Sequence, residues 1–216
     1  MGDLAKAFTE GGIFMYVILL VSVAGLAVII ERFIYLFFKY NINAQAFMAQ
    51  ITKLVMANNI DRAIKLCNAA PTAALPKVIK AGLTRANKGE IEISNAIEEA
   101  TLEVIPQIQK RVPTLLAIAN VATLLGLLGT IVGLIQAFGS LGSASPEERA
   151  SLLSKGIAVA MNTTAFGLIV AVPCMIAHIF LSNMATKIIN EIDEYSVKLE
   201  NLLAARARAG GAAISQ

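Results

Sequence analysis

Apolar residues dominate three blocks of the chain that contain no Asp, Glu, Lys or Arg: residues 11–30, 112–146 and 156–186. A helix crosses the hydrocarbon layer of a bilayer with about 20 apolar residues, and each block reaches that length. The second block would be roughly 50 Å long as one helix, which is longer than a bilayer requires. Its end, residues 139–146, is rich in Gly and Ser and is typical of a loop. The pattern predicts transmembrane helices over 13–38, 113–138 and 156–182.

Helical spacing continues in the polar segments between and after these blocks. Phe47, Ile51 and Val55 recur at spacings of four behind Asn43, which is a predicted N-cap. Further helices are predicted over 60–69, from Pro76 to about Asn87, and from Glu90 into the second span with bends at Pro106 and Pro113. No strand-like alternation occurs. We therefore predict an all-α membrane protein with three transmembrane helices, a helical insertion at 39–112 and long helices that extend into the cytoplasm.

A heptad-like seam follows the third span, with apolar residues at alternating spacings of three and four. Its members are Ala185, Ile188, Ile192, Tyr195, Leu199 and Leu202. Two interpretations are open: the helix packs on its own subunit, or identical neighbours form a bundle outside the membrane.

The charge content supports the membrane assignment. The chain has 216 residues with 18 Lys or Arg and 15 Asp or Glu, so 15% are charged, while 56% are hydrophobic. Soluble domains average about 25% charged residues, and the residues outside the three blocks reach about that level. This composition excludes a disordered chain, which needs low hydrophobicity, and it is unlike that of an ordinary soluble enzyme.

The basic residues predict the orientation of the spans. Residues 31–111 hold 11 of them and residues 183–216 hold four, while residues 1–12 hold one and residues 139–155 hold two. The positive-inside rule therefore places the N-terminus outside and the C-terminus inside. We predict a periplasmic segment at 1–12 and a periplasmic loop at 139–155, with cytoplasmic segments at 39–112 and 183–216. No basic stripe with interleaved aromatics is present, so we expect no nucleic-acid partner.

The residue inventory does not favour enzymatic chemistry. His178 is the single histidine, so a multi-histidine metal site is excluded and a histidine-based triad is not expected. Cys67 and Cys174 form no CxxC motif, and no P-loop is present. We therefore expect a protein that is not an enzyme, with no catalytic residue, metal or cofactor. Any work that it performs must use another energy source, and an ion gradient across a bacterial inner membrane is the natural candidate.

The second and third spans are unusually rich in small and polar residues. Gly129 and Gly133 form a GxxxG pattern, which lets two helices approach closely. Thr123 and Thr130 are seven residues apart and share a helix face. The alternative is that each threonine bonds its own helix and merely packs. The candidate lining residues are Asn120, Thr123, Thr130, Asn162, Thr163 and Thr164, and the candidate helix-packing residues are Gly126, Gly129, Gly133, Gly167 and Pro173.

The two spans lack an ionisable group at mid-membrane depth. Proton relays through membranes usually use such a group. If protons pass here, the titrating carboxylate must come from another polypeptide. His178 lies too near the cytoplasmic end of the third span to serve that role.

Two segments resemble the MotA/TolQ/ExbB proton-channel family, in its ExbB/TolQ branch. They are LGLLGTIVGLIQAF at 125–138 and GIAVAMNTTAFGLIVAVP at 156–173. The resemblance implies a bacterial inner-membrane homopentamer, embedded in lipid, whose second and third spans surround a lumen. A dimer of an ExbD- or TolR-like single-span partner would supply an essential Asp there. Thr130 and Thr164 match the family's two lumen-facing threonines. The complex would be the stator of a proton-driven motor that pulls on a TonB-like, TolA-like or gliding effector.

One position departs from the family's pattern. Many relatives have Glu where this chain has Val159, so no role of that carboxylate carries over, and Thr163 adds a hydroxyl where a small residue is common. The effector system and the choice between protons and sodium as coupling ion stay open. A non-conducting scaffold of an envelope complex is the alternative function. A small-molecule carrier would usually show internal repeats, and none is found.

Overall fold

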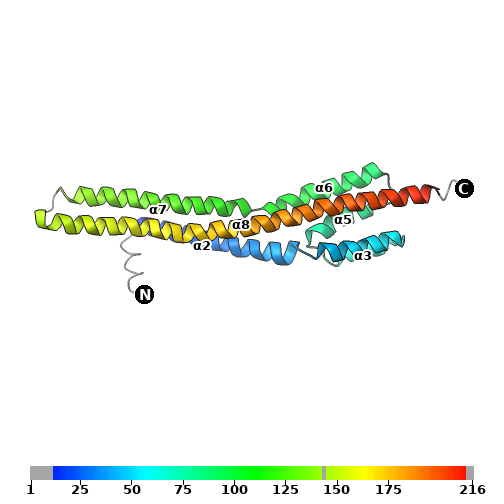
Figure 1. Ribbon diagram of the computed structural model, residues 1–216, viewed down its shortest axis with the longest axis horizontal. Helices are drawn as coiled ribbons and strands as arrows, with labels where there is room; N and C mark the ends of the chain where they lie inside the picture. Colours follow the sequence, from blue (N-terminus) through cyan, green and yellow to red (C-terminus); the bar gives the residue numbers. More distant parts are fainter. Residues whose placement is uncertain (1–11, 143–144, 213–216) are drawn as a thin grey trace. The chain divides into compact units, whose positions relative to one another are not determined.

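The computed structural model describes the backbone of residues 12–142 and 145–212 (Figure 1). Every regular element among these residues is helical and none is a strand, so the all-α prediction is confirmed. In chain order the elements are α2 (Gly12–Ile34), the π-helix η1 (Tyr35–Tyr40), α3 (Ala44–Met56), α4 (Ile60–Asn68), α5 (Ala74–Thr84), α6 (Glu90–Gln109), α7 (Val112–Ser140) and α8 (Pro146–Ala212).

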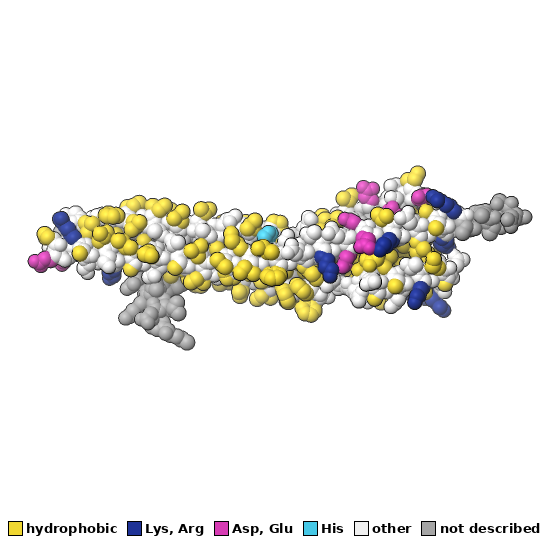
Figure 2. All heavy atoms as spheres, in the orientation of Figure 1, with side chains coloured by type: hydrophobic (Ala, Val, Ile, Leu, Met, Phe, Trp, Pro, Cys, Tyr) yellow, Lys and Arg dark blue, Asp and Glu magenta, His cyan; other side chains and the backbone are white. Residues whose placement is uncertain are grey.

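The chain divides into two compact units. The span unit contains the described residues of Met1–Glu31 and Arg111–Phe180, and the head unit those of Arg32–Lys110 and Leu181–Gln216. Three helical stretches in the described residues are long and apolar enough to cross a membrane, which confirms the number of spans. Large aliphatic side chains such as Leu20, Leu124 and Ile169 are more than 60% exposed on these stretches, as expected for surfaces that face lipid or a partner (Figure 2). The orientation of the spans stays a prediction.

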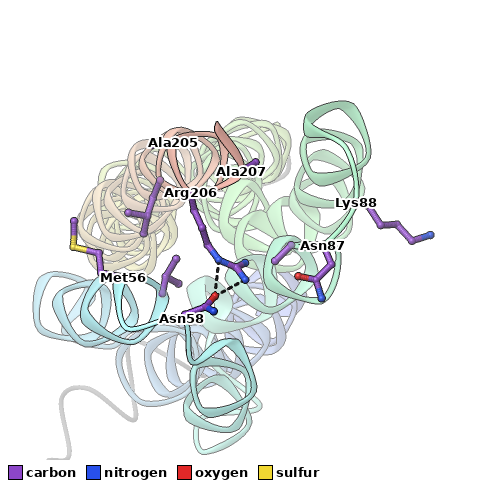
Figure 3. Close-up of a pocket in the computed structure, with 10 residues that line it drawn as sticks. Met56, Asn58, Asn87, Lys88, Ala205, Arg206 and Ala207 are labelled. Atoms are coloured by element: carbon purple, nitrogen blue, oxygen red, sulfur yellow. Dashed lines mark hydrogen bonds between the residues drawn. The ribbon is translucent and has the colours of Figure 1, made fainter. Parts of the chain in front are cut away.

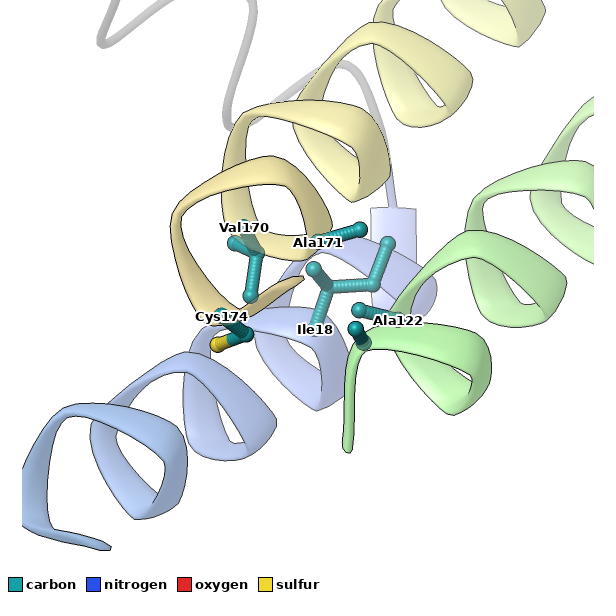
Figure 4. Close-up of a cluster of buried hydrophobic side chains, with 6 residues drawn as sticks. Ile18, Ala122, Val170, Ala171 and Cys174 are labelled. Carbon is teal, nitrogen blue, oxygen red and sulfur yellow. The ribbon is translucent and has the colours of Figure 1, made fainter. Parts of the chain in front are cut away.

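A small apolar core joins the three span helices. The cluster consists of Ile18 from α2, Ala119 and Ala122 from α7, and Val170, Ala171 and Cys174 from α8 (Figure 4). Ile18 is the one large side chain among mostly small ones, and it is fully buried. Small residues let the helix backbones approach, which is how helices associate in lipid without a hydrophobic driving force.

The helix that the sequence predicts from Glu90 into the second span is broken by two residues. Pro106 lies inside α6 without ending it, and the break comes at Lys110 and Arg111. Arg111 adopts a left-handed conformation (φ 59°), and its guanidinium pairs with the carboxylate of Glu31 at the end of α2. Pro113 then occupies the first turn of α7, where its missing N–H has no cost.

In the structure α7 ends at Ser140 and α8 begins at Pro146, so both helices extend into the segment predicted as a periplasmic loop at 139–155. The Ser145 hydroxyl and backbone N–H both donate to the Glu148 carboxylate, at 2.8 and 3.3 Å. This is a capping box with proline at the first helical position, and it explains why residues 146–155 are helical. These two hydrogen bonds lower the pKa of Glu148 below its usual value.

The head unit is built from α3 to α6 and the C-terminal part of α8. Asn43 caps α3 by accepting a hydrogen bond from the Ala46 N–H at 3.0 Å, which confirms the predicted N-cap. The unit's core consists of Ile51, Val55, Ile79, Leu83, Ile97 and Leu199, all at most 3% exposed. The seam of α8 is buried in its own subunit at Ala185, Ile188, Ile192 and Leu199, so the first of the two interpretations accounts for these positions.

The segment after α2 carries the aromatic residues that end the first predicted span. Phe33 and Phe37 stack with ring centroids 4.5 Å apart, and the Lys39 ammonium lies 4.4 Å from the centre of the Tyr35 ring. The π-helical turn brings Leu36 and Tyr40 to the buried side while Phe38 stays 77% exposed. Exposed aromatic rings beside a cation are typical of a membrane–water interface.

Burial makes the thiol of Cys67 a weak nucleophile. Desolvation raises the pKa of Cys67 to about 11, although the charge of Lys80 opposes this rise. Because the thiolate is the reactive form, iodoacetamide should alkylate Cys67 in the folded protein about 100-fold more slowly at pH 8 than in the denatured protein. The folded rate should still climb with pH above 9, where the denatured rate levels off. A Cys174→Ala background isolates the signal, and equal rates before and after denaturation would contradict this burial.

Candidate functional site

Glycines bring the backbones of α7 and α8 together in the span unit. A Cβ atom placed on Gly167 of α8 would lie 2.7 Å from the Ala122 carbonyl oxygen and 3.1 Å from the Cα atom of Gly126. A Cβ on Gly126 would lie 3.1 Å from the Thr163 carbonyl oxygen, so neither helix has room for a side chain here. Three predicted packing residues, Gly126, Gly129 and Gly167, are buried in this contact.

The close contact continues for two turns beyond the predicted residues. Gly133 faces Ala160, and Gly156 faces Ala137, whose Cβ would lie 2.2 Å from a Cβ at Gly156. Ala137 and Gly156 were not among the predicted packing residues. The signal was present as small residues spaced by four, at 129, 133 and 137 on one helix and at 156 and 160 on the other.

Three threonine hydroxyls converge on one backbone carbonyl where the helices are closest. The Gly126 carbonyl oxygen lies within hydrogen-bonding distance of the Thr130 hydroxyl at 3.1 Å and of the Thr164 hydroxyl at 3.2 Å, and the Thr163 hydroxyl oxygen lies 3.5 Å away. The Thr130 hydroxyl also reaches the Ala160 carbonyl oxygen at 3.1 Å and contacts the Thr164 hydroxyl directly. The structure therefore brings Thr130, Thr163 and Thr164 into one group, which we call the hydroxyl cluster.

The members of the hydroxyl cluster differ in exposure. Thr163 is 1% exposed, and its hydroxyl donates to the Ala160 carbonyl at 2.7 Å. That hydroxyl would lie 2.8 Å from a Cβ at Gly129, so it fills the space left by the missing side chain. Thr130 and Thr164 are only half-buried. Part of each of these two side chains is therefore accessible to a group from outside the subunit.

The remaining predicted lining residues do not join the cluster. Thr123 is half-buried and donates to the Ala119 carbonyl of its own helix at 3.1 Å, which is the arrangement we gave as the alternative for an isolated threonine. Asn120 is exposed on α7 and Asn162 is half-buried on α8. Pro173 lies inside α8 with its ring exposed, away from the glycine contact.

Val159 lies beside a small cavity next to the cluster. The cavity has a volume of about 140 Å³, and its walls include Val159, Thr163, Gly133 and Gln136 together with the first residues of α2. Gln136 brings the one side-chain amide in this wall. Val159 is thus bordered by an amide and a buried hydroxyl, and no acidic residue is among the described residues that line the cavity.

His178 has a structural contact at the other end of the α7–α8 pair. Its Nδ1 atom lies 2.9 Å from the Val112 carbonyl oxygen in the first turn of α7. The contact ties α8 to the start of α7, 14 residues before Gly126 in the sequence. It is therefore separate from the contacts that Thr164 and Gly167 make with Gly126. His178 is half-buried and belongs to no group of metal-ligand type among the described residues.

The head unit has a larger hollow of about 980 Å³ (Figure 3). The Arg206 guanidinium crosses it and donates from Nε and Nη2 to the Asn58 Oδ1 atom, at 3.0 and 2.7 Å. Asn58 follows the end of α3 with a left-handed backbone (φ 57°). Met56 and Leu202 contribute apolar side chains to the wall, and no acidic residue is among the described residues that line the hollow.

Comparison with known proteins supports the reading of the two motifs. The sequence model of the MotA/TolQ/ExbB proton channel family matches residues 71–194, which include both motifs. The chain is 31% identical over 176 residues to ExbB-like protein 3 of Synechocystis, covering 80% of this chain and 82% of that protein. It is 25% identical over 194 residues to an ExbB homolog of Methanothermobacter thermautotrophicus, covering 89% and 67%. The Tol-Pal system protein TolQ of Haemophilus influenzae is 35% identical over 99 residues, covering 44% and 43%.

These matches agree with the three spans and with a transport family rather than an enzyme family. The family match covers more than half of the chain, and the relatives carry the names ExbB and TolQ. The chain therefore belongs to the MotA/TolQ/ExbB proton channel family, in its ExbB/TolQ branch, and is a multi-pass protein of the inner membrane.

Proposed function

We propose that five copies of this chain form the wall of a proton channel in which a dimer of an ExbD- or TolR-like single-span partner supplies the titrating Asp. The observation that carries the proposal is the hydroxyl cluster of Thr130, Thr163 and Thr164, in spans without any Asp, Glu, Lys or Arg. The wall offers polar hydroxyls at one level and has no charge of its own to titrate. A carboxylate from a partner would complete it.

The energetics favour this division of roles. An ionised carboxylate inside a membrane is costly, and such groups pair with polar partners or line water. A hydrogen bond to a charged group contributes about 1.5–3 kcal/mol, so Thr130 and Thr164 would stabilise an ionised Asp at their level. Protonation of that Asp would remove the cost of moving it past the apolar wall. Proton flow would then be coupled to displacement of the partner inside a fixed stator.

The work that this motion drives is proposed from the relatives. Their names refer to biopolymer transport and to the Tol-Pal system. We infer that the complex acts on a TonB-like, TolA-like or gliding effector in the periplasm or at the outer membrane. Protons are the proposed coupling ion, with sodium as the ion to be tested against them.

Reconstituted vesicles test this function. The chain is purified with the single-span protein that accompanies it, and acidification of the lumen is followed after a pH gradient is imposed. We expect proton flux from the complex, none from the chain alone, and loss of flux when the partner's Asp is replaced by Asn. Flux that requires sodium at constant pH would change the coupling ion. A complex that assembles but passes neither ion would favour the non-conducting scaffold.

A further inference from the structure

In the head unit, the charges of α3 to α6 are segregated by helix, whereas the part of α8 in this unit carries both signs. Residues 41–89, which contain α3 to α5, hold seven basic residues and one acidic residue. Residues 90–109, which form α6, hold five acidic residues and no basic one. Such a division between neighbouring elements exceeds what the positive-inside rule requires, because that rule concerns Lys and Arg and says little about where Asp and Glu fall.

Most of these charges have no opposite charge beside them within the described residues. Arg85 and Lys88 pair with Glu92, at 3.7 and 3.2 Å. No other ion pair joins α3–α5 to α6 in that part of the chain. The unpaired basic residues are Lys53, Arg62, Lys65, Lys77 and Lys80, and the unpaired acidic residues of α6 include Glu98, Glu99 and Glu103; all are exposed.

The outer face of α6 also exposes two large aliphatic side chains. Ile91 is 77% exposed and Leu102 is 66% exposed, three turns apart on the helix. Glu98, Glu99 and Glu103 neighbour Leu102 on the helix, at four and three residues before it and one after it. Apolar residues inside an acidic rim suit a protein partner whose own rim is basic. A lipid surface does not fit, since anionic headgroups would repel these carboxylates.

The complementary surface is present on the same chain. Within the head unit, α3 and α6 lie on opposite edges, with α5 and α8 between them (Figure 1). The basic residues lie on α3, α4 and α5, and Met56 at the end of α3 is 76% exposed. Complementary patches on opposite sides of one subunit produce a head-to-tail contact, and a head-to-tail contact that closes makes a ring.

We propose that the acidic face of α6 (Ile91, Glu98, Glu99, Leu102 and Glu103) docks on the basic residues of α3 and α4 (Lys53, Arg62 and Lys65) of the next copy of this chain. The proposal rests on the self-assembly in the proposed function and names the surfaces that meet outside the membrane. The apolar side chains supply contact area, and the charges fix which face meets which. Two acidic faces or two basic faces repel each other, so the charges select the head-to-tail arrangement.

Charge reversal with rescue tests the contact on the full chain in detergent. One variant combines Glu98→Lys, Glu99→Lys and Glu103→Lys, a second combines Lys53→Glu, Arg62→Glu and Lys65→Glu, and a third carries all six changes. The matched control reverses Glu147, Asp193 and Glu194, which are exposed acidic residues outside α6. Light scattering during gel filtration gives the oligomer fraction at each protein concentration, at low and at high salt.

We expect each single-face variant to need about tenfold more protein than the wild type for half assembly, with the six-fold variant and the control close to the wild type. High salt should weaken the wild-type ring and strengthen the single-face variants, because it screens attraction and repulsion alike. A carbodiimide joins carboxylates to amines that are in direct contact. In the wild type it should link carboxylates of α6 to the lysines of α3 and α4 on the neighbouring copy, and the linked peptides should be found in the band of the cross-linked dimer.

The other outcomes separate this contact from the proposed function. A wild-type chain that is monomeric at every concentration would overturn the self-assembly on which both rest. If both charge reversals assemble like the wild type, or if the variant with all six changes assembles no better than the single-face variants, the proposed contact is wrong. The proposed channel function would be unaffected by either result. Sensitivity to reversal of the basic face alone would assign that face to an anionic lipid surface and would also overturn the contact.

Discussion

Replacing Thr164 by alanine is expected to lower proton flux through the reconstituted complex about 10- to 100-fold while the complex still assembles. The hydroxyl of Thr164 and that of Thr130 touch each other and share the Gly126 carbonyl as acceptor. Removing one of them takes a polar partner away from the level at which an ionised carboxylate would sit. A hydrogen bond to a charged group contributes about 1.5–3 kcal/mol, and each 1.4 kcal/mol corresponds to about a factor of ten in rate.

The variants at this position separate chemistry from packing. Thr164→Ser keeps the hydroxyl and should retain most of the flux, whereas Thr164→Val keeps the shape and should lose as much as alanine does. Thr130→Ala should behave like Thr164→Ala, because both hydroxyls act at one place, and the double variant should lose little more than either single one. Gel filtration establishes that the complex is intact. Normal flux in both single variants and in the double variant would remove the basis for the channel assignment.

The helix pattern could be predicted from the sequence because each element carries its own signal. The three charge-free blocks gave the spans, and Asn43 marked the start of α3. The sequence also contains the S-x-x-E pattern of Ser145 and Glu148, which is typical of a helix start, and α8 begins there within the predicted periplasmic segment 139–155. The left-handed backbone of Arg111 could not be predicted from the sequence, since arginine has no intrinsic preference for positive φ and adopts it here at a helix break.

The residue types of the candidate site could be predicted from the sequence, but the alignment of α7 against α8 could not. Small residues on both helices indicated a close contact, and the motifs singled out Thr130 and Thr164. The two motifs do not determine which turn of α7 packs against which turn of α8. The convergence of three hydroxyls on the Gly126 carbonyl depends on that register, and so does the place of Thr163 against Gly129. The same register leaves Thr123 outside the hydroxyl cluster, and its hydroxyl therefore donates to the Ala119 carbonyl of its own helix.

Adding one methyl group at Gly167 is expected to separate α7 from α8 and to damage both stability and flux. The new Cβ would lie 2.7 Å from the Ala122 carbonyl oxygen and 3.1 Å from the Gly126 Cα atom, and both are backbone atoms that cannot turn aside. Overpacking of a tight contact costs about 1–3 kcal/mol, so Gly167→Ala should melt at a lower temperature and Gly167→Val at a lower one still. Because Gly167 is one turn from Thr164, the same displacement should pull the Thr164 hydroxyl away from the Gly126 carbonyl.

Two measurements distinguish this mechanism from a general loss of folding. Thermal melting by circular dichroism compares Gly167→Ala on α8 with Gly139→Ala on α7. The Cβ added at Gly139 would meet nothing within 4 Å, so this control should be at least as stable as the wild type. The thiol of Cys174, which is 4% exposed in the core shared by α2, α7 and α8, reports on helix separation directly. Gly167→Ala should let a maleimide reach Cys174 below the melting temperature, and the control should not. A Gly167→Ala protein that melts, labels and conducts like the wild type would show that the two backbones do not approach as closely as the hydroxyl cluster requires.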